Sequence, residues 1–212
     1  FRIAMIFSFG YLILTYFIAI CAGSIMGYFG GKTDILGLRL VEIWANVPFL
    51  YMVIILVSVM PGWWGVGWQV ASLLFIMVLF SWTGMTYYVR AAVYKEKARD
   101  YVAAARVLGA SPFRVIFRHL LPNVISTLVT FAPFTVAAAI SSITALDFLG
   151  YGLPAPTPSW GRLLKQGVSN LSIAPWIVIS TVSALVLTLT LVTFVGEAVR
   201  EAFDPKKFST YE

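Results

Sequence analysis

Five long apolar segments restrict this chain to very few folds. They run from about Ile3 to Phe29, Leu40 to Met60, Gln69 to Tyr88, Leu120 to Gly150 and Ser172 to Val195. A helix needs ~20 mostly apolar residues to cross a bilayer. Lipid offers the backbone no hydrogen-bond partner, so a lipid-facing segment satisfies its own bonds as a helix. The segments also lack the alternation of barrel strands. The sequence therefore predicts an all-α polytopic membrane protein with five spans.

The composition agrees with a bilayer environment. Only 11% of the 212 residues are charged, whereas a soluble domain carries about 25%. The tryptophan-rich turn "PGWWGVGW", residues 61–68, is typical of an aromatic belt at the lipid headgroups. The loops between the spans therefore carry most of the information about sidedness.

Basic residues gather on one side of the predicted spans. Of the 15 Lys and Arg residues, only Arg2, Arg162 and Lys165 lie on the first of the two sides, the one that is poor in basic residues. The others lie in a predicted turn (Gly30–Arg39), an insert (Val89–His119) and the tail from Gly196. The positive-inside rule places this second side, with the C-terminus, in the cytoplasm. The first span then starts outside, which leads us to expect a sixth span before Phe1.

The insert contains a basic helical hairpin at about residues 95–121. Its sequence "DYVAAARVLGASPFRVIFRHLLPN" places Tyr101, Ala104, Ala105 and Leu108 at i, i+3, i+4 and i+7, an apolar stripe on one helix. Gly109 follows as a C-terminal cap. Ser111 and Pro112 suit the N-cap and first turn of a second helix. This pattern fits a helix resting on lipid as well as a docking element.

The hairpin resembles the EAA loop of ABC-importer permeases. Ala104, Ala105, Gly109 and Leu121-Pro122 stand at that motif's alanine, glycine and Leu-Pro positions. "GYFGGKTD" (27–34), "PTPSWGRLL" (156–164) and "EAVREAFDPKK" (197–207) are similar to the dipeptide, oligopeptide and nickel permeases. "TALDFLGYGLP" (144–154) is most similar to the Yej-type subunit of peptide and microcin importers.

The resemblance implies a coupling helix that docks on a cytoplasmic ATPase. The expected coupling residues are Asp100, Tyr101, Ala103, Ala104, Ala105, Leu108, Gly109, Ala110, Ser111 and Pro112. Ala103 stands where the family has Glu. Whether Asp100 or Glu96, one and two turns upstream, replaces that acid is left open.

The fourth span and the loop after it supply further candidates. Asp147, Pro133, Ser141 and Ser142 are candidates for the translocation path or a close helix contact. Pro133 also predicts a kink. The Pro-rich loop at about residues 150–171 is expected to be periplasmic, with Trp160 and Arg162 as candidates for docking a binding protein. Glu42 is expected to pair with Arg39 at the end of the second span.

Nothing in the sequence predicts catalysis by this chain. "GYFGGKT" (27–33) has one residue too few for a P-loop. The only histidine, His119, has no second ligand nearby for a metal site. We therefore expect no metal, no cofactor and no nucleic acid on this chain.

The resemblance implies a single permease domain over residues 1–212 in a bacterial inner membrane. Its expected partners are a second homologous permease, two ATP-binding domains that carry ATP and Mg, a periplasmic peptide-binding protein, and lipid. The peptide's length and composition stay open. The alternatives are an ion-driven secondary transporter or channel with the hairpin on lipid, and, less favoured, a membrane enzyme.

Overall fold

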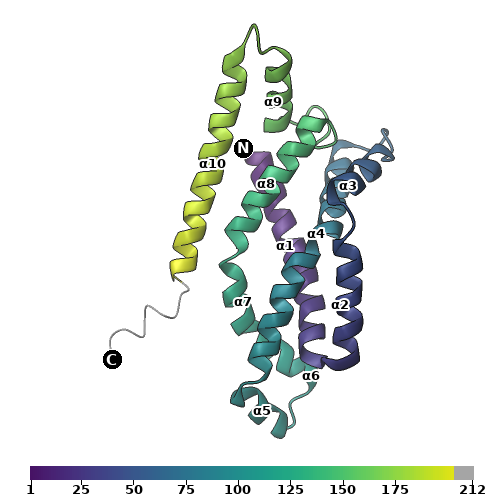
Figure 1. Ribbon diagram of the computed structural model, residues 1–212, viewed down its shortest axis with the longest axis vertical. Helices are drawn as coiled ribbons and strands as arrows, with labels where there is room; N and C mark the ends of the chain where they lie inside the picture. The colour runs from purple at the N-terminus through teal and green to yellow at the C-terminus, as the bar shows by residue number, and fades with distance from the viewer. Residues whose placement is uncertain (203–212) are drawn as a thin grey trace. The chain divides into compact units, whose positions relative to one another are not determined.

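The computed structural model describes residues 1–202, apart from the side chain of Thr127. Over this range the chain is helical and contains no strand, which confirms the all-α prediction (Figure 1). The elements in chain order are α1 (Arg2–Phe29), α2 (Gly31–Ala45), α3 (Phe49–Ser58), α4 (Val66–Lys97), α5 (Asp100–Val107), α6 (Pro112–Arg114), the π-helical η1 (Val115–Leu120), α7 (Leu121–Val129), α8 (Ala132–Leu149), α9 (Trp160–Ser169) and α10 (Pro175–Ala202).

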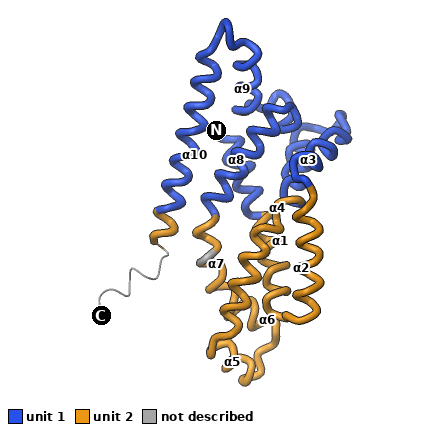
Figure 2. The backbone as a smooth tube through the Cα atoms, in the orientation of Figure 1, with its two compact units in different colours: residues 1–13, 48–79, 132–197 blue, residues 14–47, 80–131, 198–212 orange. Residues whose placement is uncertain are grey.

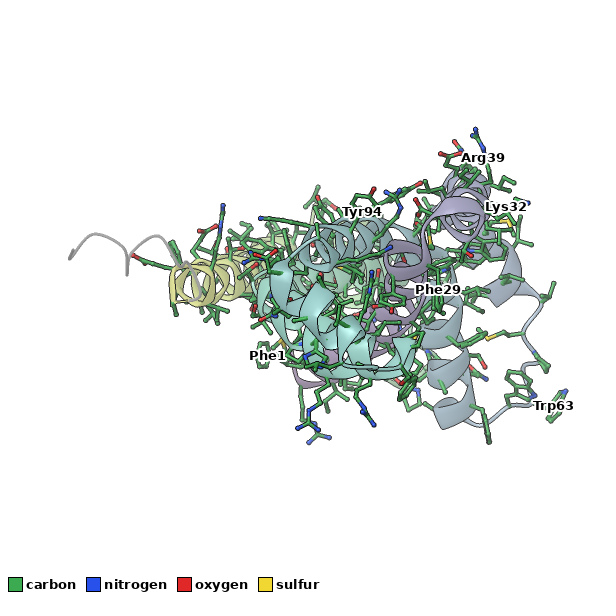
Figure 3. All side chains as sticks on the ribbon, turned by 90° about the horizontal axis from the view of Figure 1, so that it is seen from below. Phe1, Phe29, Lys32, Arg39, Trp63 and Tyr94 are labelled. Carbon is green, nitrogen blue, oxygen red and sulfur yellow. The ribbon has the colours of Figure 1, made fainter. Side chains whose placement is uncertain are left out.

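Four of these helices, α1, α4, α8 and α10, are long and apolar enough to cross a membrane. The pair α2 and α3, bent by 70°, makes a fifth crossing if it acts as one broken span. The chain is therefore polytopic within its described residues. The turn between α3 and α4 carries the strongly exposed Trp63, which projects from the ribbon (Figure 3).

The chain divides into two compact units, each with its own apolar core (Figure 2). Unit 1 comprises residues 1–13, 48–79 and 132–197, and unit 2 comprises residues 14–47, 80–131 and, among those described, 198–202. Val102, Val115 and Leu120, all from the basic hairpin, are fully buried in the core of unit 2 beside Val89 and Val93 of α4. The hairpin is therefore folded into a core and does not merely rest against a surface.

Two glycines let α1 and α4 approach closely in unit 2. A Cβ atom at Gly23 would lie 2.7 Å from Val89 Cβ and 2.9 Å from the Arg90 backbone nitrogen. One at Gly27 would lie 2.8 Å from the Arg90 carbonyl oxygen. Their spacing is that of a small-xxx-small motif, which brings helix backbones together in lipid. This spacing is visible in the sequence, but the sequence analysis did not predict a close contact between these two helices.

We expect Gly23→Leu to destabilise unit 2, because the new side chain meets backbone that cannot rotate away. Overpacking of this kind costs about 1–3 kcal/mol. Thermal unfolding in detergent measures it, with Gly84→Leu on α4 as the matched control, since a Cβ there meets nothing within 4 Å. Equal unfolding temperatures for the two variants would contradict the close packing.

The predicted turn at Gly30–Arg39 and the unbroken second span from Leu40 are wrong. The turn is confined to Gly30 and Gly31, whose φ values are 65° and 52°, and α2 begins at Gly31. Asp34 and Val41 lie on its buried face. The helix ends before Pro48, which has no N–H to donate; Val47 donates instead to the Trp44 carbonyl at 3.2 Å.

The third and fourth spans also differ from their predicted bounds. The third was predicted to stop at Tyr88, but α4 continues through Arg90 to Lys97. The fourth was predicted as one helix and is broken between α7 and α8, just before Pro133. The proline ring removes the N–H that would bond four residues back. The predicted kink at Pro133 is therefore confirmed as a full break.

Candidate functional site

The basic hairpin turns where the sequence predicted. Gly109 has a φ of 80°, in the left-handed region that favours glycine. The Ser111 hydroxyl accepts a hydrogen bond from the Arg114 N–H at 3.4 Å, with Pro112 in the first turn of α6. Both local predictions are confirmed, and they set α5 apart from the helix that follows.

Three of the four residues of the predicted apolar stripe, Tyr101, Ala104 and Leu108, are exposed on α5, and the fourth, Ala105, is buried. Val102 packs into the core of unit 2, and Ala105 is also buried. Leu108, predicted to share the stripe, is 87% exposed, and Val107 beside it is 88% exposed. Two branched apolar side chains therefore project outward at the end of α5.

Most of the predicted coupling residues lie on the surface of the hairpin. Ala105 is buried and Ala110 is half-buried. The exposed members are Asp100, Tyr101, Ala103, Ala104, Leu108, Gly109, Ser111 and Pro112. The helix thus presents small residues along its length and a larger apolar tip at its end.

Tyr101 connects α5 to two other segments. Its hydroxyl donates to the Glu96 carboxylate at 2.8 Å, near the end of α4. The Asn123 side-chain amide of α7 donates to the same hydroxyl at 3.0 Å and to the His119 carbonyl at 3.1 Å. Burial raises the pKa of Tyr101, and its hydrogen bond to Glu96 raises it further, so the hydroxyl remains a donor. The sequence analysis did not predict a role for Asn123. The one local signal was the adjacent Pro122, whose missing N–H indicates a change in the helix at this point.

The helix between the hairpin and α7 is widened. In η1 the Leu121 N–H donates to the Ile116 carbonyl, five residues back. Pro122 has no N–H for the carbonyl four residues before it, which favours such a local change of pattern. The widened turn lies directly before the segment that holds Asn123.

Two further contacts join the helix ends in unit 2. The Tyr28 ring, at the end of α1, lies 5.7 Å from Lys97 Nζ of α4 and 5.1 Å from Arg106 Cζ of α5, measured to the ring centroid. Arg90 of α4 binds Asp34 of α2 in a two-pronged ion pair, with Nη2 to Oδ2 at 2.5 Å. The hairpin, α1, α2 and α4 are thus joined by polar contacts as well as by the core.

The two acids upstream of Ala103 differ in what they contact. Glu96 is occupied, since its carboxylate binds Arg99 Nε at 2.9 Å and accepts the Tyr101 hydrogen bond. Asp100 is exposed in the first turn of α5. Of these two acids, Asp100 is therefore the more exposed.

In unit 1, Asp147 and Arg162 hold the loop after α8. The Asp147 carboxylate is buried and accepts the Leu153 N–H at 2.5 Å. Arg162 of α9 donates to the Leu153 carbonyl at 2.6 Å and to the Thr157 carbonyl at 3.2 Å. Gly161 packs against the Thr144 carbonyl, where a Cβ would collide. The predicted loop thus contains a helix and is fixed from both ends.

The other predicted residues of unit 1 are spread along α8 and α9. Pro133 lines an apolar cavity of about 350 Å³ between α1, α8 and α10. Ser141 is exposed and donates to the Ala137 carbonyl at 3.0 Å, and Ser142 beside it is half-buried. Trp160 is half-buried, with its ring 6.2 Å from that of Phe1. The structure does not gather these residues into one site.

Within residues 1–202, no three His, Cys, Asp or Glu side chains gather as metal ligands. The predicted pair of Arg39 and Glu42 forms at 2.8 Å, exposed on α2; Figure 3 shows Arg39 turned away from the helix. The two most defined features of the described residues are thus the hairpin turn at Gly109 and the loop after α8.

Comparison with known proteins decides the family. The model of the binding-protein-dependent transport system inner membrane component matches residues 19–209. The chain belongs to this family. It is 43% identical over 98% of its length to the peptidoglycan transport system permease protein YejE of Agrobacterium fabrum, and 42% identical over 97% to the inner membrane ABC transporter permease protein YejE of Escherichia coli. The oligopeptide transport system permease protein OppC of Haemophilus influenzae is 36% identical over 87%.

The chain spans about half the length of these permease relatives, covering 52%, 58% and 57% of them. Among solved structures, it resembles a chain of the MetNI methionine ABC transporter in an inward-facing conformation. The TM-score is 0.72 over 95% of this chain and 93% of that one, at 18% identity. This likeness shows that the permease family member shares the transporter's fold.

Proposed function

We propose that this chain is the transmembrane permease domain of an ATP-driven peptide importer. It forms the translocation path with a second homologous permease, and residues 1–212 act as one domain. The proposal is supported by the family, by the names of the peptide permeases it resembles, and by the helices able to cross a membrane.

The observation that carries the proposal is the exposed apolar tip of α5. Val107 and Leu108 are 88% and 87% exposed at the end of α5, next to the exposed small residues Ala103 and Ala104. Exposed apolar residues grouped in this way mark an interaction site. A cleft on a cytoplasmic ATPase accounts for them, with Asp100 as the acidic contact in place of the family's Glu. The ATPase subunits, two per complex, bind ATP and Mg.

Sidedness follows from the same assignment. The hairpin and the C-terminus face the cytoplasm of a bacterium, and the loop after α8 faces the periplasm. Trp160 and the surface around α9 then meet a peptide-binding protein, while Arg162 shapes that surface from within. On α8, Ala138, Ser141 and Ala145 form an exposed line of small residues suited to the second permease. Asp147, Pro133 and Ser142 stay path candidates.

The mechanism we propose is alternating access. Closure of the two ATPase subunits moves α5, and the spans rearrange between outward and inward openings. Such coupling requires that the hairpin bind the two ATPase states with different free energies, because equal contacts shift no equilibrium.

The test uses the full-length permease purified with its partners and reconstituted in liposomes. We expect an ATPase to co-purify and labelled oligopeptide uptake to require ATP. Leu108→Glu is expected to remove both, because it places a charge in an apolar contact. Ala103→Glu is the matched control, since it adds the same charge where the family carries it, and should keep both.

Uptake that persists without ATP, with no ATPase bound, would support the ion-driven transporter and overturn the proposal. Equal behaviour of the two Glu variants would overturn the assignment of the α5 tip as the docking contact.

A further inference from the structure

The hydroxyl of Tyr101 makes two side-chain hydrogen bonds and also lies 3.4 Å from the His119 carbonyl oxygen. It has one proton, which it donates to Glu96 at 2.8 Å, and it accepts one N–H from Asn123 at 3.0 Å. Asn123 uses its amide again, on the His119 carbonyl at 3.1 Å. One oxygen atom therefore joins the end of α4, the first turn of α5 and the first turn of α7.

The apolar contacts of α5 do a different job. Val102 holds the helix against the core of unit 2, but burial of apolar surface has no preferred direction. Apolar contacts alone therefore fix the position and orientation of a short helix less sharply than directional bonds do. Hydrogen bonds weaken steeply when their angle or length changes, and the bond to a carboxylate is among the stronger kinds.

We propose that Tyr101 is the positioning residue that passes movement of α5 to the membrane-spanning helices. This inference rests on the proposed function. When α5 is displaced, Tyr101 pulls on Glu96 and Asn123 together, so α4 and the start of α7 follow the hairpin. The widened turn of η1 lies between α6 and α7. A change in the hydrogen bonding of this turn would also let the start of α7 shift.

The test measures transport per ATP hydrolysed by the reconstituted importer. Tyr101→Phe keeps the ring and removes only the hydroxyl. We expect it to fold, and we expect peptide transported per ATP, measured on the complexes that retain their ATPase, to fall by about tenfold. A role in folding alone would change the unfolding temperature and leave this ratio unaltered.

Two further variants make the test specific. Asn123→Ala removes the other end of the tether and should lower the ratio as much as Tyr101→Phe. The double variant should fall no further than either single one, because both changes break one path. Tyr94→Phe is the control, since Tyr94 is 61% exposed on α4 and should leave the ratio unchanged.

Wild-type transport per ATP in Tyr101→Phe overturns the inference and leaves the proposed function intact. Fully additive losses in the double variant also overturn it, because they mean two separate effects. Transport by the wild type that needs no ATP overturns the proposed function and this inference with it.

Discussion

Gly109→Val is expected to abolish transport while the protein still folds. Gly109 has a φ of 80°, and the left-handed conformation costs an ordinary residue about 1–2 kcal/mol, with branched side chains among the worst cases. Nothing lies within 4 Å of a Cβ built there, so the strain comes from the backbone alone. The chain relieves that strain by reshaping the turn, which reorients the α5 tip relative to α6.

The measurement is ATP-dependent peptide uptake in liposomes, normalised to the amount of assembled complex. Gly109→Asn is the matched control, because asparagine tolerates the left-handed region several-fold better than most residues. It should keep most of the uptake. If the valine variant transports as well as the asparagine variant, the turn geometry at Gly109 is not needed for coupling.

Asp34→Ala is expected to cause a large loss of stability. It leaves the partly buried Arg90 guanidinium without its carboxylate, in a pair whose side chains are 27% and 13% exposed. Removing one member of a buried pair costs about 3–5 kcal/mol, and the lower end applies because Arg90 keeps some access to solvent. Denaturant or thermal unfolding in detergent measures the loss.

The same helix supplies the control. Glu42 pairs with Arg39 at 2.8 Å, but this pair is exposed, with side chains 73% and 45% accessible for Arg39 and Glu42. Exposed pairs contribute about 0–1 kcal/mol, so Glu42→Ala should be nearly silent. Equal losses for the two alanine variants would mean that the Arg90 pair does not act as a buried one.

Local chemistry explains what the sequence predicted well. The Gly109 turn and the Ser111 N-cap depend on neighbours in the chain, and both appear as expected. Pro133 was a sound signal for a helix break for the same reason. Pro48 gave an equally local signal that the predicted second span overlooked, and there the helix does break.

The misses depend on partners far apart in the chain. Asp34 and Arg90 are 56 residues apart, and the predicted turn at Gly30–Arg39 did not include their ion pair. Tyr101 and Asn123 are 22 residues apart and meet only because α5 folds back on the chain. Helical spacing shows which residues of α5 share a face, but it does not show that Val102 packs into the core of unit 2.

Through Leu153, the contacts of Asp147 and Arg162 connect the end of α8 to α9. Asp147 lies in the last turn of that helix, and the Leu153 residue that it binds is also held by Arg162 of α9. The loop between α8 and α9 is held at Leu153 and Thr157, which restricts its movement relative to these helices. We therefore expect the loop and α9 to move together with the end of α8, and the apolar cavity beside Pro133 lies near the other end of that helix.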